Sequence, residues 1–195
     1  MKRIAIVGGI GSGKSVVSRL LSLMGYPVYD CDSNAKRLMD ESEAIHRGLV
    51  DIFGPRAITP NGIDRAYIAS IAFNDAEKLS RLNALVHPAV LHDFDSWAQR
   101  NGGTVFVETA ILAESGMSKS VDAVWSVEAP LEIRVERVMA RNAMSREDVL
   151  RRISSQAATI PDEIPSVTHL TNDGRHALIP QIVAAIRRES QKRRN

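Results

Sequence analysis

The stretch Gly8–Ser15, GGIGSGKS, places four glycines, a lysine and a hydroxyl directly after a short apolar run. Glycine weakens both strands and helices, so this composition serves something other than core packing. Gly8, Gly13, Lys14 and Ser15 occupy every fixed position of G-x-x-x-x-G-K-[ST], a loop whose backbone N–H groups bind phosphates. The stretch therefore predicts a site for a nucleoside triphosphate, with Lys14 on the β- and γ-phosphates and Ser15 as a ligand of Mg²⁺.

Two carboxylates stand at the end of the second expected strand, in the sequence YDCDSNAKRL. Asp30 and Asp32 would then lie at the crevice that the carboxyl ends of parallel strands share with the phosphate loop. One of them could accept a proton from an attacking hydroxyl, as kinase aspartates do. Both could equally serve as caps or turn formers, and Ser33 is the expected N-cap of the following helix.

Four further residues could carry chemistry, and two of them have an ordinary structural alternative. Arg65 and His87 fall in a helical segment, where a lone arginine is commonly a solvated charge and a histidine before proline commonly ends a helix. Glu108 ends the third expected strand, where an acid could be a second partner of Mg²⁺. Glu114 follows on a loop or short helix.

Arg134, Arg137 and Arg141 follow one another at helical spacing, so they share one face of an expected helix. Such a face is either solvated or closes over polyphosphate as a lid. The phosphate loop earlier in the chain favours the lid.

The surrounding pattern predicts an α/β fold. Most of the expected strands are near-continuous apolar runs, typical of parallel strands covered on both faces, and helical segments separate them. The five expected strands are Arg3–Val7, Pro27–Asp30, Thr104–Glu108, Asp122–Val127 and Val167–Thr171.

Two gaps between these strands are too long for simple crossovers. We expect a single domain whose core comprises residues 1–32, 102–130 and 164–195. A helical insertion at about 33–101, with no strand of its own, would carry acceptor contacts. A helical lid at about 131–163 would contain helices near Leu131–Arg141 and Arg146–Gln156, the second capped by Ser145. A last helix near Ala177–Glu189 closes the chain.

Composition narrows the class of protein further. The chain has 195 residues, 44% hydrophobic and 25% charged, and a net charge of +2. This balance implies no polyanion partner, so we expect neither nucleic-acid nor membrane binding, and we interpret the basic C-terminal end as a solvated helix end. The single cysteine, Cys31, leaves no intrachain disulfide and fits a cytoplasmic protein. No apolar stretch is long enough to span a membrane, and the first strand begins too early for a signal peptide.

Several motifs, in this order, resemble the dephospho-coenzyme A kinase family over nearly the whole chain. The D-x-D after the second strand and L-N-x-x-x-H-P are much more specific than the phosphate loop, which very many proteins share. The stretches that carry the resemblance are GGIGSGKS at 8–15, DCD at 30–32, GIDRAYIASIAF at 62–73, LNALVHP at 82–88, ILAE at 111–114, RVMARNAMSRE at 137–147, Gln156 and the stretch 172–174.

The resemblance implies a P-loop kinase with a five-stranded parallel sheet, and transfer of the γ-phosphate of ATP to the ribose 3′-hydroxyl of dephospho-CoA. It implies Asp32 as catalytic base, with Lys14 and Arg141 also catalytic. It implies acceptor binding by Asp30, Asp32, Arg65 and His87, and a Mg²⁺ ligand in Ser15. The implied ATP contacts are Gly8, Gly9, Ile10, Gly11, Ser12, Gly13, Lys14, Ser15, Val16, Arg137 and Asn172.

Arg134 shares the arginine face but has no counterpart in the family pattern. Departures from that pattern fall around the expected acceptor pocket, adenine wall and lid, at Ala110, Ile111, Ala113, Asn142, Thr168 and His169. Two alternatives remain: another P-loop kinase of small metabolites or nucleoside monophosphates, and a P-loop ATP switch that acts through a partner. The chain length argues against the switch, since no separate effector domain fits. We expect a monomer or small homo-oligomer.

Overall fold

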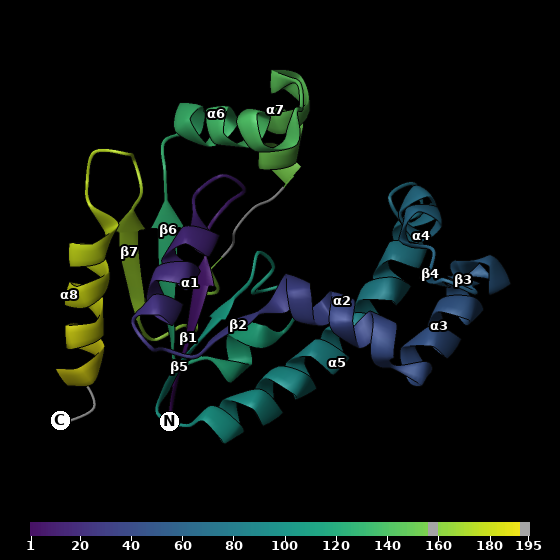
Figure 1. Ribbon diagram of the computed structural model, residues 1–195, viewed down its shortest axis with the longest axis horizontal. Helices are drawn as coiled ribbons and strands as arrows, with labels where there is room; N and C mark the ends of the chain where they lie inside the picture. Colours follow the sequence, from purple (N-terminus) through teal and green to yellow (C-terminus); the bar gives the residue numbers. More distant parts are fainter. Residues whose placement is uncertain (156–159, 192–195) are drawn as a thin grey trace. The chain divides into compact units, whose positions relative to one another are not determined.

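The computed structural model describes residues 1–155 and 160–191 (Figure 1). The chain divides into two compact units, Met1–Tyr29 with Ala98–Asn195, and Asp30–Trp97. Gln156 and most of the basic C-terminal end lie outside the described residues. No helix in the described part of the chain is both long and apolar enough to cross a membrane.

A five-stranded sheet forms the centre of the first unit, and its strands run in the order β2-β5-β1-β6-β7. The pairs β1–β5, β1–β6 and β6–β7 are parallel, with Ile4 opposite both Phe106 and Ala123. All five predicted strands are present, each shifted by at most one residue at an end. They are β1 Lys2–Val7, β2 Val28–Asp30, β5 Thr104–Glu108, β6 Ala123–Glu128 and β7 Val167–Thr171.

The central strands β1, β5 and β6 are largely apolar and buried, as strands covered by helices are. Residues of α1 and α8 belong to the same buried cluster as Ile4, Phe106 and Trp125 of the sheet. Trp125 is fully buried and packs edge-on against Phe106, with ring centroids 5.0 Å apart. The helical elements of this unit are α1 Lys14–Leu23, the 3-10 helix Met117–Ser120, α6 Leu131–Asn142, α7 Arg146–Ser155 and α8 Leu178–Gln191.

Helices α6 and α7 form a hairpin with a small core of its own, made of Val135, Val138 and Val149. Helix α6 ends at Asn142, and the capping residue that follows, Ala143, has a positive φ of 50°. The Ser145 hydroxyl then accepts a hydrogen bond from the Asp148 backbone N–H at 3.1 Å, which caps α7 as the sequence predicts.

The second unit is mainly helical. Its elements are α2 Cys31–Glu41, α3 Glu43–Phe53, the 3-10 helix Pro55–Ala57, β3 Ile58–Thr59, β4 Gly62–Ile63, α4 Arg65–Ala72 and α5 Ala76–Asn101, the last of which continues into the first unit. Its core centres on Ile45, Leu49, Phe53 and Ile68.

Two predictions from the sequence are wrong for this unit. No strand was expected here, yet β3 and β4 form a short antiparallel hairpin. The Pro60–Gly62 turn joins them, and the Thr59 hydroxyl donates to the Gly62 carbonyl at 2.9 Å, which closes the hairpin. Ser33 does not cap α2: Asp30 does, because its carboxylate accepts from the backbone N–H groups of Asp32 and Ser33.

Candidate functional site: a phosphate loop clamped from outside

The loop between β1 and α1 has a backbone that only glycine allows at several positions. Gly8, Gly11 and Gly13 have positive φ, and Gly13 precedes the first residue of α1 in a left-handed conformation. A Cβ atom on Gly8 would lie 2.4 Å from the Val127 carbonyl oxygen. The glycines therefore let the chain pass close to β6 and enter α1 with its first N–H groups facing the loop.

Polar groups inside this loop are placed for an anion. The Lys14 ammonium donates to the Gly8 carbonyl at 2.7 Å, which holds the side chain back along the loop. The Ser12 hydroxyl is buried and has no hydrogen-bond partner within the described residues. Ser15 and Val16, the next two residues of α1, are exposed. A phosphate group would supply the acceptor that the buried hydroxyl lacks.

Three consecutive carbonyls of the loop are held by side chains from distant segments. Arg134 donates from Nε to the Ile10 carbonyl at 2.9 Å, and Arg137 donates from Nη1 to the Gly11 carbonyl at 3.4 Å. The amide of Asn172 donates to the Ser12 carbonyl at 2.8 Å. The C=O and the following N–H of a trans peptide point in opposite directions. Clamping these carbonyls therefore turns the intervening N–H groups to the other side of the loop.

The arginine face of α6 divides into two parts. Arg134 and Arg137 are half-buried against the loop, whereas Arg141 is exposed and donates from Nε to the side-chain Oδ1 of Asn142 at 2.8 Å. Partial burial lowers the pKa of the Arg134 guanidinium from its usual value. Arg134 is the residue that sequence reasoning undervalued, although its helical spacing from Arg137 was the signal that could have found it.

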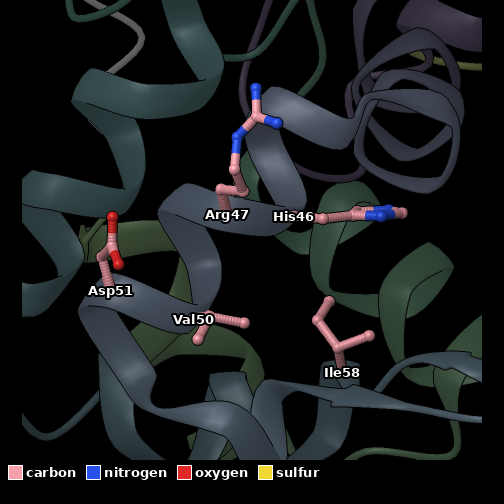
Figure 2. Close-up of a pocket in the computed structure, with 5 residues that line it drawn as sticks. All are labelled: His46, Arg47, Val50, Asp51 and Ile58. Carbon is pink, nitrogen blue, oxygen red and sulfur yellow. The ribbon is translucent and has the colours of Figure 1, made fainter.

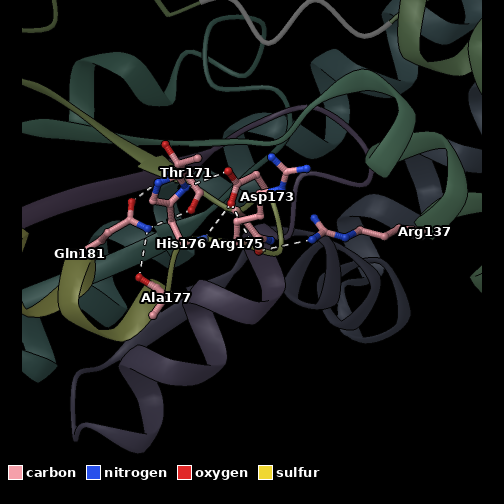
Figure 3. Close-up of polar contacts among 8 residues, drawn as sticks. Arg137, Thr171, Asp173, Arg175, His176, Ala177 and Gln181 are labelled. Atoms are coloured by element: carbon pink, nitrogen blue, oxygen red, sulfur yellow. Dashed lines mark hydrogen bonds and ion pairs between the residues drawn. The ribbon is translucent and has the colours of Figure 1, made fainter.

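The segment after β7 holds Asn172 in place. Asn172 donates its backbone N–H to the Glu128 carbonyl at 2.7 Å, and its side-chain oxygen accepts from Arg137 Nη2 at 3.5 Å. Figure 3 shows the anchoring beside it, where the Gln181 side chain bonds both backbone groups of Thr171.

Asp173 closes this segment into a tight turn. Its carboxylate accepts from the backbone N–H groups of His176 and Arg175, both at 2.9 Å, and contacts His176 Nδ1 at 2.8 Å (Figure 3). These hydrogen bonds hold the pKa of the Asp173 carboxyl well below its usual value, and the two from backbone N–H groups have the largest effect. The turn that carries Asn172 is therefore fixed at both ends.

Glu108 ends β5 in register with Ile6 of β1, two residues before the glycine loop begins. It is half-buried, and Glu114 lies farther along the following segment. Within residues 1–155 and 160–191 no group of three or more His, Cys, Asp or Glu side chains could hold a metal ion.

In the second unit, the D-x-D pair divides into two roles. Asp30 is occupied locally: its carboxylate caps α2 and accepts from the Ser33 hydroxyl at 2.7 Å. Asp32 lies in the first turn of α2 and is exposed. The Asp30 carboxylate is therefore engaged in capping α2, whereas that of Asp32 is not part of the cap.

The other two predicted acceptor residues lie on separate helices of this unit. Arg65 begins α4 and forms an ion pair of 2.7 Å with Asp40 of α2, an acid that the sequence analysis did not consider. His87 is half-buried in the interior of α5, whose helix continues through Pro88. The alternative in which His87 ends a helix is therefore wrong.

A pocket of about 380 Å³ lies in this unit, lined by His46, Arg47, Val50, Asp51 and Ile58. Figure 2 shows Val50 and Ile58 extending toward each other from α3 and β3, with Asp51 pointing away from them. None of the predicted acceptor residues lines it, so it gives no support to their assignment.

The strand order, with the glycine loop leaving the central strand β1 and wrapping onto a helix N-terminus, defines a P-loop nucleotide-binding protein. Two solved structures share this fold at low sequence identity. Dephospho-CoA kinase from Campylobacter jejuni has a TM-score of 0.67 and 21% identity, and the match covers 99% of this chain and 100% of that one. Shikimate kinase from Acinetobacter baumannii has a TM-score of 0.55 and 16% identity, with 98% and 94% covered.

More similar relatives identify the family within this class. The family model described as dephospho-CoA kinase matches residues 2–177. A dephospho-CoA kinase of Bacteroides fragilis is 37% identical over 186 residues, covering 94% of this chain and 91% of the relative. One of Thermobifida fusca is 35% identical over 196 residues, covering 99% and 98%. A crystal structure from Thermus thermophilus has 35% identity and a TM-score of 0.77, with 98% and 97% covered. The chain belongs to the dephospho-CoA kinase family, an ATP-dependent group of kinases.

Proposed function

We propose that this chain transfers the γ-phosphoryl group of ATP to the ribose 3′-hydroxyl of dephospho-CoA, with Asp32 as the general base. Lys14, Arg137 and Arg141 offset the charge that spreads over the phosphoryl oxygens in the transition state. The reaction draws on ATP, and we place it in the cytoplasm as part of this proposal.

The observation that carries the donor half is the clamp on three consecutive loop carbonyls, at Ile10, Gly11 and Ser12. The clamp preorganises the backbone N–H groups that would receive the phosphates, so the loop needs little reorganisation when ATP binds. The buried Ser12 hydroxyl adds a polar group that a phosphate oxygen would satisfy.

Mg²⁺ is the cation we expect to accompany ATP, and the side chains present suit it. The hydroxyl of Ser15, exposed in the first turn of α1, and the carboxylate of Glu108 at the end of β5 are hard oxygen donors, which Mg²⁺ prefers. Mg²⁺ would neutralise part of the charge on the β- and γ-phosphates.

The acceptor half rests on Asp32, Asp30, Arg65 and His87, which occupy the family's acceptor positions. Asp32 is an exposed carboxylate, whereas the Asp30 carboxylate caps α2. This difference supports Asp32 as the proton acceptor and Asp30 as the group that orients it. Arg65 is held by Asp40, which fixes a cation where a phosphate of the acceptor could be recognised.

An acceptor screen tests the proposal directly. The purified chain is incubated with ATP and Mg²⁺ together with dephospho-CoA, adenosine, AMP, shikimate or gluconate, and the products are weighed by mass spectrometry. We expect a gain of one phosphate on dephospho-CoA alone. Phosphorylation of another acceptor instead would support the rival small-metabolite kinase, and slow ATP hydrolysis with no phosphorylated acceptor would support an ATP switch.

Lys14→Ala is the matched inactive control for the screen. Lys14 is not a core residue, so its far-UV circular dichroism spectrum should match that of the wild type while phosphoryl transfer disappears. Near-normal turnover in this variant would contradict the assignment of the phosphate loop. A lost spectrum would show that Lys14 supports the fold instead.

A further inference from the structure

Arg134 contacts the phosphate loop in two ways. Its Nε donates to the Ile10 carbonyl at 2.9 Å, and its guanidinium lies over Gly9. A Cβ atom built on Gly9 would come within 2.3 Å of Arg134 Nη2 and 2.8 Å of its Cζ. The Ile10 side chain also packs on the apolar core that α6 forms with α7. The tip of the loop and helix α6 are therefore joined through backbone and side chains together.

We propose that Arg134 is a positioning residue of the phosphate loop, which acts through the backbone of Gly9 and Ile10 rather than on the reacting phosphate. This inference rests on the proposed function, because it assigns Arg134 a part in binding ATP. It also relates the glycine at position 9 to a side chain outside the loop, that of Arg134 on α6.

The donor atom decides which side chains can replace Arg134. The bond to Ile10 comes from Nε, not from the terminal nitrogens. The amide nitrogen of glutamine is separated from Cα by the same number of bonds as arginine Nε, so Arg134→Gln can donate the same hydrogen bond without a charge. Arg134→Ala has no donor, so a comparison of the two variants separates positioning from charge.

Gly9 differs from the other glycines of the loop. Gly8, Gly11 and Gly13 have positive φ, whereas Gly9 does not, so a positive φ is not what calls for glycine at position 9. The three atoms nearest to a Cβ at position 9 all belong to the Arg134 guanidinium. An alanine at position 9 would therefore have to displace the Arg134 guanidinium from its place over the loop.

Gly11 provides the matched control for this argument. Its φ is +79°, and a Cβ there would lie 2.6 Å from the backbone oxygen of Arg134. Truncating the Arg134 side chain removes neither constraint. An alanine at position 11 should thus cost the same whether or not the arginine is present, unlike an alanine at position 9.

The test measures affinity for the nonhydrolysable analogue AMPPNP with Mg²⁺ by calorimetry. Arg134→Ala should weaken binding roughly 10-fold or more, as expected for one lost charge-assisted hydrogen bond. Arg134→Gln should stay within about threefold of the wild type, since a neutral hydrogen bond retains much of that strength. Arg146→Ala, which removes an exposed arginine paired with Glu132, should leave the affinity unchanged.

A double-mutant cycle completes the experiment. Gly9→Ala should weaken binding in the wild type but add little in the Arg134→Ala background. Gly11→Ala should weaken binding by the same factor in both backgrounds. Thermal melts give the temperature at which each variant begins to unfold, and binding is measured below the lowest of these temperatures, where all variants are folded.

Two results would overturn the proposal: equal affinities for Arg134→Gln and Arg134→Ala, or a Gly9→Ala cost that is the same in both backgrounds. These measurements need no acceptor, so a failed acceptor screen would leave them standing. A wild-type chain that does not bind AMPPNP would overturn the proposed function and this inference together.

Discussion

The side-chain amide of Asn172 donates a hydrogen bond to the backbone carbonyl of Ser12 at 2.8 Å, although 160 positions separate the two residues in the chain. A Cβ atom on Gly13 would lie 2.0 Å from the same amide nitrogen. The segment after the last strand therefore rests directly on the loop after the first strand. The turn that carries Asn172 thus helps to shape the phosphate loop.

Asn172→Ala should raise the KM for ATP by roughly fivefold to tenfold, the equivalent of one lost hydrogen bond. The kcat and the KM for dephospho-CoA should change less, because Asn172 bonds the donor loop. Steady-state kinetics with each substrate varied in turn measure the split. Thr171→Ala is the control, since Thr171 bonds Gln181 through its backbone N–H and C=O, which alanine keeps. A change confined to the KM for dephospho-CoA would place Asn172 on the acceptor side.

Asp32→Asn should lower kcat by about 10²- to 10⁴-fold, the range that general-base catalysis contributes, with ATP affinity little changed. Asparagine keeps the size of the side chain but cannot take the proton. The same substitution at Asp30 should cost much less, because asparagine is also a good N-cap for α2. Rapid-quench measurement of the chemical step compares the two. An inactive Asp30→Asn beside an active Asp32→Asn would reverse the assignment.

Arg141→Ala should lower kcat more than it raises the KM for dephospho-CoA, because an interaction strongest in the transition state is seen in kcat. Arg141→Lys should restore activity only in part, since an ammonium lacks the planar pair of donors. Steady-state kinetics on both variants test this. Arg151, an exposed arginine of α7 paired with Asp148, is the control. Equal and negligible effects at both positions would mean that Arg141 is a solvated surface residue.

Asp173→Asn should destabilise the chain at pH 7 and matter less in acid. The pKa of the Asp173 carboxyl is held well below its usual value by hydrogen bonds from His176 and Arg175. A carboxylate of this kind stabilises the fold above its unfolded pKa of about 3.9, and its contribution is lost as the pH falls further. Urea unfolding of both proteins between about pH 6 and pH 3 measures the difference, which should shrink toward acid. A difference that does not change with pH would show that this ionisation is not linked to folding.

The three arginines of α6 show where sequence reasoning stops. Helical spacing places Arg134, Arg137 and Arg141 on one face, and the structure keeps them on α6. The family pattern offered no role for Arg134, yet Arg134 and Arg137 each contact a loop carbonyl, while Arg141 turns to Asn142. Which arginine reaches the loop depends on how α6 packs on Ile10, and no periodicity along the helix contains that information.

The sequence by itself determined the phosphate loop, the five strands and the helices that follow them. These features depend on residues near one another in the chain: glycines that permit positive φ, apolar runs that suit a covered sheet, and a lysine and a hydroxyl at a helix start. The tertiary structure alone decided that Arg134, Arg137 and Asn172 hold three successive carbonyls of that loop. Those contacts join residues more than a hundred positions apart, and only the packing of α6 and of the turn after β7 against the loop that follows β1 brings them within hydrogen-bonding distance.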